Sequence, residues 1–166
     1  MDAQPVLAVL ARALEEARLE AILIGNMAAA LHGAPVSTVD VDFFFRKTRG
    51  NLKKLKEVAG TLRASILRPY YPASGLFRLQ RDEDALQVDF MSAIDGVGSF
   101  ERVRSRAKRL AMGGHELLVA DLEDIIASKK AAGRSKDKAV LDILRVTLDE
   151  TKRAQQSRTR GTPEGK

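Results

Sequence analysis

Two aspartates, Asp40 and Asp42, are separated by one residue within an apolar segment, VDVDFFF. This composition predicts a β-strand, in which alternate side chains project to the same face. We therefore expect Asp40 and Asp42 to share one face, with Val39, Val41 and Phe43 buried on the other. Because neighbouring carboxylates repel each other, such a pair lowers stability unless a cation lies between them.

A third carboxylate, Asp89, lies on another predicted strand, 86–91, between apolar neighbours. Hard cations such as Mg²⁺ prefer oxygen ligands, and they usually bind one or two carboxylates together with substrate phosphates and water. Aspartates on adjacent strands could hold two such ions for phosphoryl chemistry. The alternative is that Asp40, Asp42 and Asp89 are ordinary edge or surface residues, because a D-x-D pair alone is a weak motif.

A glycine turn upstream of the aspartate pair is a candidate phosphate site. Gly25 and Asn26 follow a short apolar strand, 21–24, and precede a helix of small residues, 27–32. Free backbone N–H groups at such a helix start attract phosphate, although a plain turn remains the alternative. Three cationic side chains further along the chain could neutralise phosphate charge: Lys129, Arg134 and Lys136.

A sheet with helices packed against it is needed to position these residues, and the apolar periodicity predicts one. Helices are expected over 5–18, 27–32, 51–62, 99–105, 121–133 and 136–152. Strands are expected over 21–24, 38–45, 64–67, 76–80, 86–91, 107–112 and 116–119. We expect one domain over residues 1–153, with a core at about 20–120 and C-terminal helices at about 121–153. The polar, aperiodic residues 154–166 are expected to form a disordered basic tail.

The composition narrows the classes of protein and partner. The 166 residues carry a net charge of +6, which favours polyanionic partners such as nucleotides or RNA, although a solvated basic surface explains it equally well. Without Cys and with only two His, the chain has no disulfide, thiolate nucleophile, Cys-ligated zinc or His-rich metal site. No apolar run reaches the ~18 residues that span a bilayer, and the N-terminus lacks a secretory pattern, so we expect a cytoplasmic protein without a membrane partner.

The pattern I-G-N-x13-D-V-D-F, at residues 24–43, resembles the nucleotidyltransferase superfamily of DNA polymerase beta. The segment LEDIIASKKAAGRSKDKAVLDIL, at 122–144, is similar to a helical signature of small bacterial nucleotidyltransferases, including toxins of toxin–antitoxin pairs. The resemblance covers residues 20 to 150, approximately. It implies an α+β fold, with a mixed central β-sheet packed by helices and a C-terminal helical segment.

The resemblance also implies roles for the candidate residues. Asp40, Asp42 and Asp89 would be catalytic and bind two Mg²⁺ ions, and Asp89 would help to deprotonate the acceptor hydroxyl. Gly25 and Asn26 would hold the triphosphate. Phosphate or acceptor would be contacted by Lys129, Arg134 and Lys136. The implied reaction transfers a nucleoside monophosphate from a nucleoside triphosphate such as ATP to a hydroxyl of an RNA end, a protein or a small molecule, and an antitoxin protein is an implied partner.

Two departures from the family pattern lead to a second hypothesis. Asn26 stands where the family usually has Gly or Ser, and Val36 stands where many relatives have Arg. Both are consistent with a catalytically decayed fold that acts as a nucleotide- or partner-binding module. The intact aspartates argue against decay, because an acidic cluster without a metal lowers stability and gives no benefit. A purely basic nucleic-acid binder would explain the charge but not the carboxylates.

Overall fold

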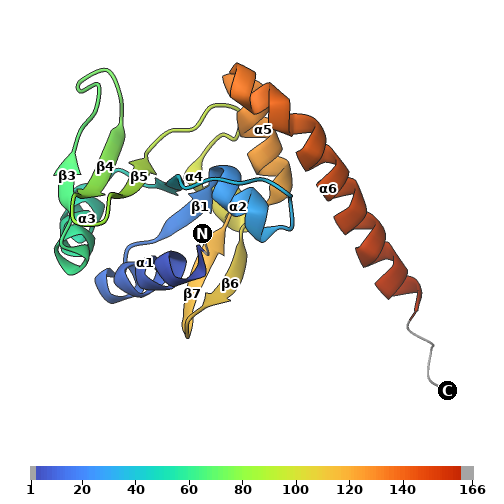
Figure 1. Ribbon diagram of the computed structural model, residues 1–166, viewed down its shortest axis with the longest axis horizontal. Helices are drawn as coiled ribbons and strands as arrows, with labels where there is room; N and C mark the ends of the chain where they lie inside the picture. Colours follow the sequence, from blue (N-terminus) through green and yellow to red (C-terminus); the bar gives the residue numbers. More distant parts are fainter. Residues whose placement is uncertain (1–2, 162–166) are drawn as a thin grey trace.

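The computed structural model describes residues 3–161, and its centre is a seven-stranded mixed sheet with helices packed against it (Figure 1). The strand order is β3-β4-β5-β2-β1-β7-β6. The strands are β1 (Ala21–Ile24), β2 (Val41–Phe45), β3 (Ser65–Leu67), β4 (Leu76–Arg81), β5 (Leu86–Met91), β6 (Lys108–Met112) and β7 (His115–Val119). The helices are α1 (Gln4–Ala17), α2 (Gly25–Leu31), α3 (Arg49–Leu62), α4 (Phe100–Arg106), α5 (Leu122–Ala132) and α6 (Ser135–Arg160). This arrangement confirms the predicted α+β class.

Strand β2 lies near the middle of the sheet and carries the largest apolar side chains of the core. It pairs with β1 in antiparallel and with β5 in parallel register. Phe43 stacks on Phe90 of β5 with ring centroids 5.2 Å apart, whereas Phe44 meets Phe100 of α4 on the opposite face of the sheet. Burial of one such side chain contributes roughly 1.5–3 kcal/mol, so β2 is a rigid support for the polar residues at its start.

The start of β2 differs from the prediction. The strand begins at Val41, so Asp40 lies just outside it, and the side chain of Val39 is 77% exposed instead of buried. The cause is the short neighbouring strand: β1 ends at Ile24, opposite Asp42, and the chain then turns into α2. Residues before Val41 therefore have no strand partner on that side of the ladder.

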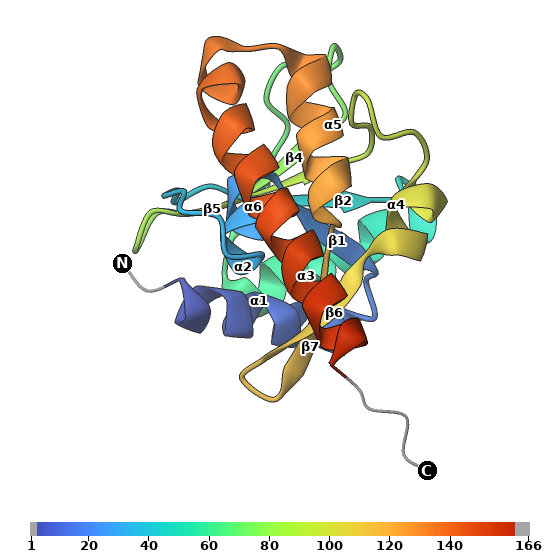
Figure 2. The ribbon, with the colours of Figure 1, turned by 90° about the vertical axis from the view of Figure 1, so that its right-hand side faces the viewer.

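The C-terminal helices form an antiparallel pair at one side of the sheet (Figures 1 and 2). Helix α5 starts at Asp121, whose side chain accepts a hydrogen bond from the backbone N–H of Glu123, and it ends at Gly133 in a left-handed conformation with φ 62°. The sharp turn at Gly133 brings the start of α6 back over the end of α5. Figure 2 shows α6 lying across α5 and continuing past the sheet.

Helix α6 continues to Arg160, so it occupies residues 154–160 of the segment expected to be a disordered tail. The segment TKRAQQSRTR has no Gly or Pro before Gly161 and contains good helix formers, which favour continuation of the helix although no apolar face requires it. Residues 162–166 of the expected tail lie outside the described part of the chain. Within residues 3–161, no helix combines the length and apolar character needed to cross a membrane.

Candidate active site

Asp42 and Asp89 are directly opposite each other on neighbouring strands. The parallel register of β2 and β5 pairs Asp42 with Asp89, and the antiparallel register of β1 and β2 pairs Ile24 with Asp42. Paired residues on adjacent strands project to the same face, so the two carboxylates share the face of the sheet that also carries Phe44. The structure therefore brings together two of the three predicted aspartates through strand register.

Asp42 has an unusual electrostatic environment. Burial, followed by the charges of Asp89 and Asp40, raises the pKa of Asp42 from 3.8 to about 6, whereas the charges of Lys129 and Lys136 oppose this rise. The charges that shift the pKa of Asp42 therefore come from β5, from the segment before β2 and from the α5–α6 corner. Strongly shifted carboxylates of this kind are concentrated at functional sites.

Asp40 contributes from a different position than predicted. It is exposed and precedes the strand, and its backbone N–H donates to Thr38 Oγ1 at 3.0 Å. Its charge nevertheless lies close enough to raise the pKa of Asp42. Asp40 is therefore an exposed carboxylate at the rim of the site, whereas the carboxylate of Asp42 is held in place by the sheet.

Asp89 has a partner that was not predicted from the sequence. Arg78 of β4 lies opposite Asp89 and donates from Nε to Oδ1 at 2.8 Å and from Nη2 to Oδ2 at 3.1 Å. Both side chains are mostly buried, with 28% and 14% of their surfaces exposed. The turn between β4 and β5 occupies residues 82–85, so Arg81 pairs with Leu86 and, three residues further along each strand, Arg78 pairs with Asp89. Counting back from this turn in the sequence could have predicted the pair.

Gly25 allows the close approach of α2 to Asp42. Its φ is +73°, and a Cβ atom at this position would lie 3.1 Å from Asp42 Oδ2. The next residue, Asn26, has a buried side-chain oxygen, Oδ1, with no hydrogen-bond partner in the described part of the chain. A buried, unpartnered carbonyl oxygen costs roughly 1–3 kcal/mol unless a ligand satisfies it. Val36, the second departure from the family pattern, packs partly buried against the core.

The three predicted cations all lie at the α5–α6 corner but differ in exposure. Lys129, at the end of α5, has only 9% of its side chain exposed, whereas Lys136, in the first turn of α6, is exposed. Burial lowers the pKa of Lys129. The Arg134 guanidinium is 60% exposed and binds Asp137, a buried carboxylate that was also not predicted from the sequence.

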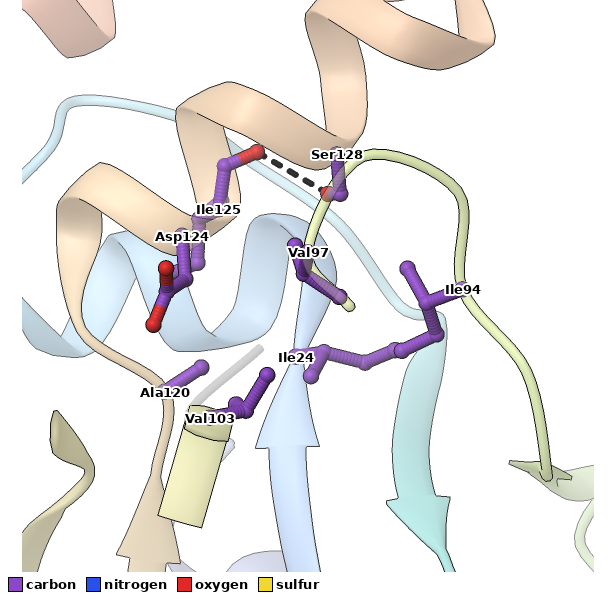
Figure 3. Close-up of a pocket in the computed structure, with 8 residues that line it drawn as sticks. All are labelled: Ile24, Ile94, Val97, Val103, Ala120, Asp124, Ile125 and Ser128. Carbon is purple, nitrogen blue, oxygen red and sulfur yellow. Dashed lines mark hydrogen bonds between the residues drawn. The ribbon is translucent and has the colours of Figure 1, made fainter. Parts of the chain in front are cut away.

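A small cavity lies beside this site, between the end of β1 and helix α5 (Figure 3). Its lining is apolar apart from Asp124 and Ser128, whose Oγ donates to the carbonyl of Ile125 at 3.0 Å. The Oδ2 atom of Asp124 is buried without a hydrogen-bond partner in the described chain, and burial raises the pKa of Asp124. A lining of this kind offers a nucleotide few polar partners, so we assign the cavity to packing.

The acidic residues fit a magnesium ion in a particular way. Burial and the neighbouring carboxylates of Asp89 and Asp40 destabilise the ionised form of Asp42, and a bound cation would stabilise it. Within residues 3–161, no three acidic or histidine side chains converge closely enough to hold a metal by themselves. Mg²⁺ commonly binds one or two carboxylates and takes its other oxygens from phosphate and water, and the carboxylates of Asp42 and Asp40 are of the type that would hold such an ion.

Several solved structures have a similar fold. The structure of ANT(2″)-Ia in complex with adenylyl-2″-tobramycin matches with a TM-score of 0.63 at 15% identity, covering 93% of this chain and 97% of that chain. An antigenic nucleotidyltransferase-like protein from Paracoccidioides brasiliensis matches with a TM-score of 0.57 at 15% identity, covering 88% and 75%. The lincomycin-bound lincosamide antibiotic adenylyltransferase LnuA matches with a TM-score of 0.56 at 11% identity, covering 80% and 89%.

The sequence places the chain within one family of this class. The model of the family described as nucleotidyl transferase of unknown function (DUF2204) matches residues 3–160, so the chain belongs to that family. No curated protein matches the sequence. The predicted nucleotidyltransferase superfamily and enzyme class are therefore confirmed.

Proposed function

We propose that the protein is a Mg²⁺-dependent enzyme that transfers a nucleoside monophosphate, with ATP as the first candidate donor, to a hydroxyl acceptor. The observation that carries the proposal is the register of β2 and β5, which sets Asp42 beside Asp89 on one face, against Gly25 and within electrostatic reach of Lys129. This arrangement combines carboxylate oxygens for a metal, a helix start without a side chain at Gly25 and a cation that can neutralise phosphate.

In the proposed reaction, each residue has a defined task. Asp40 and Asp42 hold the metal, which when bound polarises the α-phosphoryl group and the attacking oxygen. Lys129, Arg134 and Lys136 contact the triphosphate, and the backbone N–H groups of Gly25 and Asn26, at the start of α2, hold it. The acceptor oxygen forms a bond to the α-phosphorus, the bond to the β-phosphate bridging oxygen breaks, and pyrophosphate leaves. Asp89 takes the hydroxyl proton, because a carboxylate oxygen that binds Arg78 retains a second lone pair.

The acceptor is proposed as a class, and three classes are consistent with the site: an RNA end, a protein or a small molecule. Two proteins of similar fold were solved with antibiotics, ANT(2″)-Ia with adenylyl-2″-tobramycin and LnuA with lincomycin, which supports a small molecule. The net charge of +6 supports RNA instead. A toxin-type role with an antitoxin partner predicts that expression of the protein slows growth, and that an Asp42→Asn variant does not.

The test is incubation with each α-labelled nucleoside triphosphate, Mg²⁺ and, separately, total RNA, total protein and a panel of hydroxylated antibiotics. Label on one acceptor class, lost in an Asp40→Asn/Asp42→Asn variant and retained in Asp142→Asn, supports the proposal. Asp142 is a suitable control because its carboxylate is 91% exposed on α6. Absence of label with every donor and acceptor overturns turnover as the function.

A second candidate function, a decayed fold that binds nucleotide without turnover, is favoured by two observations. Both oxygens of Asp89 are bound by Arg78, and Asn26 Oδ1 lacks a partner in the described chain. This candidate predicts Mg²⁺-dependent nucleotide binding by calorimetry without label transfer. It further predicts that Asp40→Asn leaves nucleotide affinity unchanged or raises it, because a negative charge near the phosphates is removed.

A further inference from the structure

Asp137, in the first turn of α6, is a buried carboxylate to which the proposed reaction gives no task. Only 1% of the residue is exposed, whereas aspartates are almost never fully buried unless they are paired. It lies at the α5–α6 corner, four residues after the left-handed Gly133. Its burial therefore requires an explanation in terms of the groups around it.

Two cations bind Asp137 from two directions. The Arg134 guanidinium donates from Nε to Oδ2 at 2.6 Å and from Nη2 to Oδ1 at 3.2 Å, and Lys129 Nζ lies 3.6 Å from Oδ1. Although burial opposes it, the hydrogen bond from Arg134 lowers the pKa of Asp137, so the carboxylate is ionised. One buried negative charge thus joins the end of α5 to the start of α6.

Lys129 binds this carboxylate from α5, which packs against α2, the helix that begins at Gly25 beside Asp42. Its charge acts on Asp42 as well as on Asp137, so the ammonium is within electrostatic reach of both. A lysine side chain has a flexible four-carbon stem, and its attachment to one partner determines where the charge is presented. Without Asp137, the ammonium is free to move onto Asp42 and to compete there with a metal ion.

We propose that Asp137 is a positioning residue that holds Lys129 and Arg134 at the α5–α6 corner, so that Lys129 faces the triphosphate instead of neutralising Asp42. This inference rests on the proposed function, and it adds a residue that touches neither nucleotide nor metal. The consequence is that loss of Asp137 weakens nucleotide binding through Lys129, while the bond-making groups on β2 and β5 stay in place.

The test compares Asp137→Asn with Asp142→Asn, an exposed carboxylate on the same helix that pairs with Arg145. For Asp137→Asn we expect KM for the nucleoside triphosphate to rise about tenfold, with kcat within about threefold of wild type, consistent with a loss of ~1.4 kcal/mol of binding. Asp142→Asn leaves both constants unchanged. An unchanged KM in a folded Asp137→Asn variant overturns the inference.

A double-mutant cycle separates positioning from general structure. In a Lys129→Met background, Asp137→Asn should weaken nucleotide binding by no more than about twofold, because its effect acts through Lys129. Equal effects in both backgrounds overturn the inference. If Asp137→Asn does not fold, Asp137→Glu, which moves the carboxylate by one methylene, must show the same rise in KM with kcat retained; an unchanged KM there also overturns it.

Wild-type activity distinguishes failure of the positioning role from failure of the proposed function. A wild-type protein that transfers label and loses it in Asp42→Asn, but whose KM is insensitive to Asp137, overturns the positioning role alone. A wild-type protein that neither binds nucleotide nor transfers it, by calorimetry and by label, overturns the proposed function and this inference with it.

Discussion

The Arg78 guanidinium and the Asp89 carboxylate form a two-pronged hydrogen-bonded ion pair across neighbouring strands, at 2.8 and 3.1 Å. This geometry suits the planar fork of arginine, and both partners are mostly buried. Asp89 is thus held rigidly on the face of the sheet, beside the carboxylate of Asp42. The pair keeps two like charges on adjacent strands tolerable, because Arg78 neutralises one of them.

Removal of this clamp should be measurable as a loss of stability. For Arg78→Gln we expect the free energy of unfolding to fall by about 2 kcal/mol, because a mostly buried carboxylate loses its charged donor. Urea denaturation at pH 7.5 checks this. The matched control is Arg109→Gln, whose pair with Glu116 is exposed on both sides and should change stability by less than about 0.5 kcal/mol. Equal losses in the two variants would show that the Arg78 pair is no stronger than a surface pair.

The raised pKa of Asp42 predicts a dependence of stability on pH. The folded state holds the Asp42 proton up to about pH 6, whereas the unfolded chain releases it near 3.8, so wild-type stability falls as pH rises through this range. Asp42→Asn removes the titration and should be more stable than wild type at pH 7.5, by at most about 3 kcal/mol. Urea denaturation in chelator at several values from pH 4 to 8 measures the difference. A difference that does not shrink towards pH 4 would show that ionisation of Asp42 is not its cause.

Magnesium should reduce the difference in stability between Asp42→Asn and the wild type at pH 7.5. A ligand that binds only the folded state stabilises it in proportion to the logarithm of its concentration, so Tm of the wild type should rise on titration with Mg²⁺ at pH 7.5. Asp42→Asn, which lacks the negative charge of the carboxylate held by the sheet, should show little or no rise. Differential scanning calorimetry of both proteins, with and without a nucleoside triphosphate, provides the comparison. Equal rises in both proteins would place the ion elsewhere.

Gly25 and Gly33 form a natural pair for a test of close approach. Both have a left-handed φ, of +73° and +93°, but a Cβ at Gly25 would meet Asp42 Oδ2 at 3.1 Å, whereas a Cβ at Gly33 would meet nothing within 4 Å. Gly33→Ala should therefore cost only the backbone strain of about 1–2 kcal/mol. Gly25→Ala should cost more and should also lower nucleotidyl transfer at least tenfold. If both variants lose only stability and to the same extent, space beside Asp42 is not required.

The last part of α6 should be dispensable for the core. Residues 154–160 are exposed along the helix, so they bury no apolar surface. Deletion of residues 154–166 should reduce the circular dichroism signal at 222 nm while leaving Tm within about 2 °C of the full chain. A larger fall in Tm would show that residues 154–166 stabilise the rest of the protein.

Local patterns were sufficient to predict most of the sheet. Strands 21–24 and 86–91 match β1 and β5, and the strands predicted over 107–112 and 116–119 correspond to β6 and β7, which pair in antiparallel register. The errors occur where the neighbouring element decides the outcome. Val39 has the residue type of a buried strand position, but the end of β1 at Ile24 leaves it without a partner. Similarly, helix propensity alone extends α6 to Arg160, where the absence of an apolar pattern had suggested disorder.

The sequence was sufficient to predict the charged residues of the candidate site but not the ion pairs that they form. The D-x-D spacing and the V-D-F strand identified Asp42 and Asp89, and strand register does bring them together. Two partners of the candidate residues were missed: Arg78, which binds Asp89, and Asp137, which binds Lys129 and Arg134. The pairing of Arg78 with Asp89 required the register of a hairpin. The pairing of Asp137 with Lys129 required the packing of α5 against α6, which no local spacing contains.

The parallel pairing of β2 with β5 also has a consequence for the order in which the chain assembles. Antiparallel neighbours close in sequence, such as β4 and β5, can join early, whereas β2 must wait for a long crossover before it meets β5. If this pairing is completed after the folding barrier, the mutual repulsion of Asp42 and Asp89 accelerates unfolding without slowing folding. In a chain built this way, the proposed metal and nucleotide would slow unfolding when bound and so prolong the lifetime of the native state.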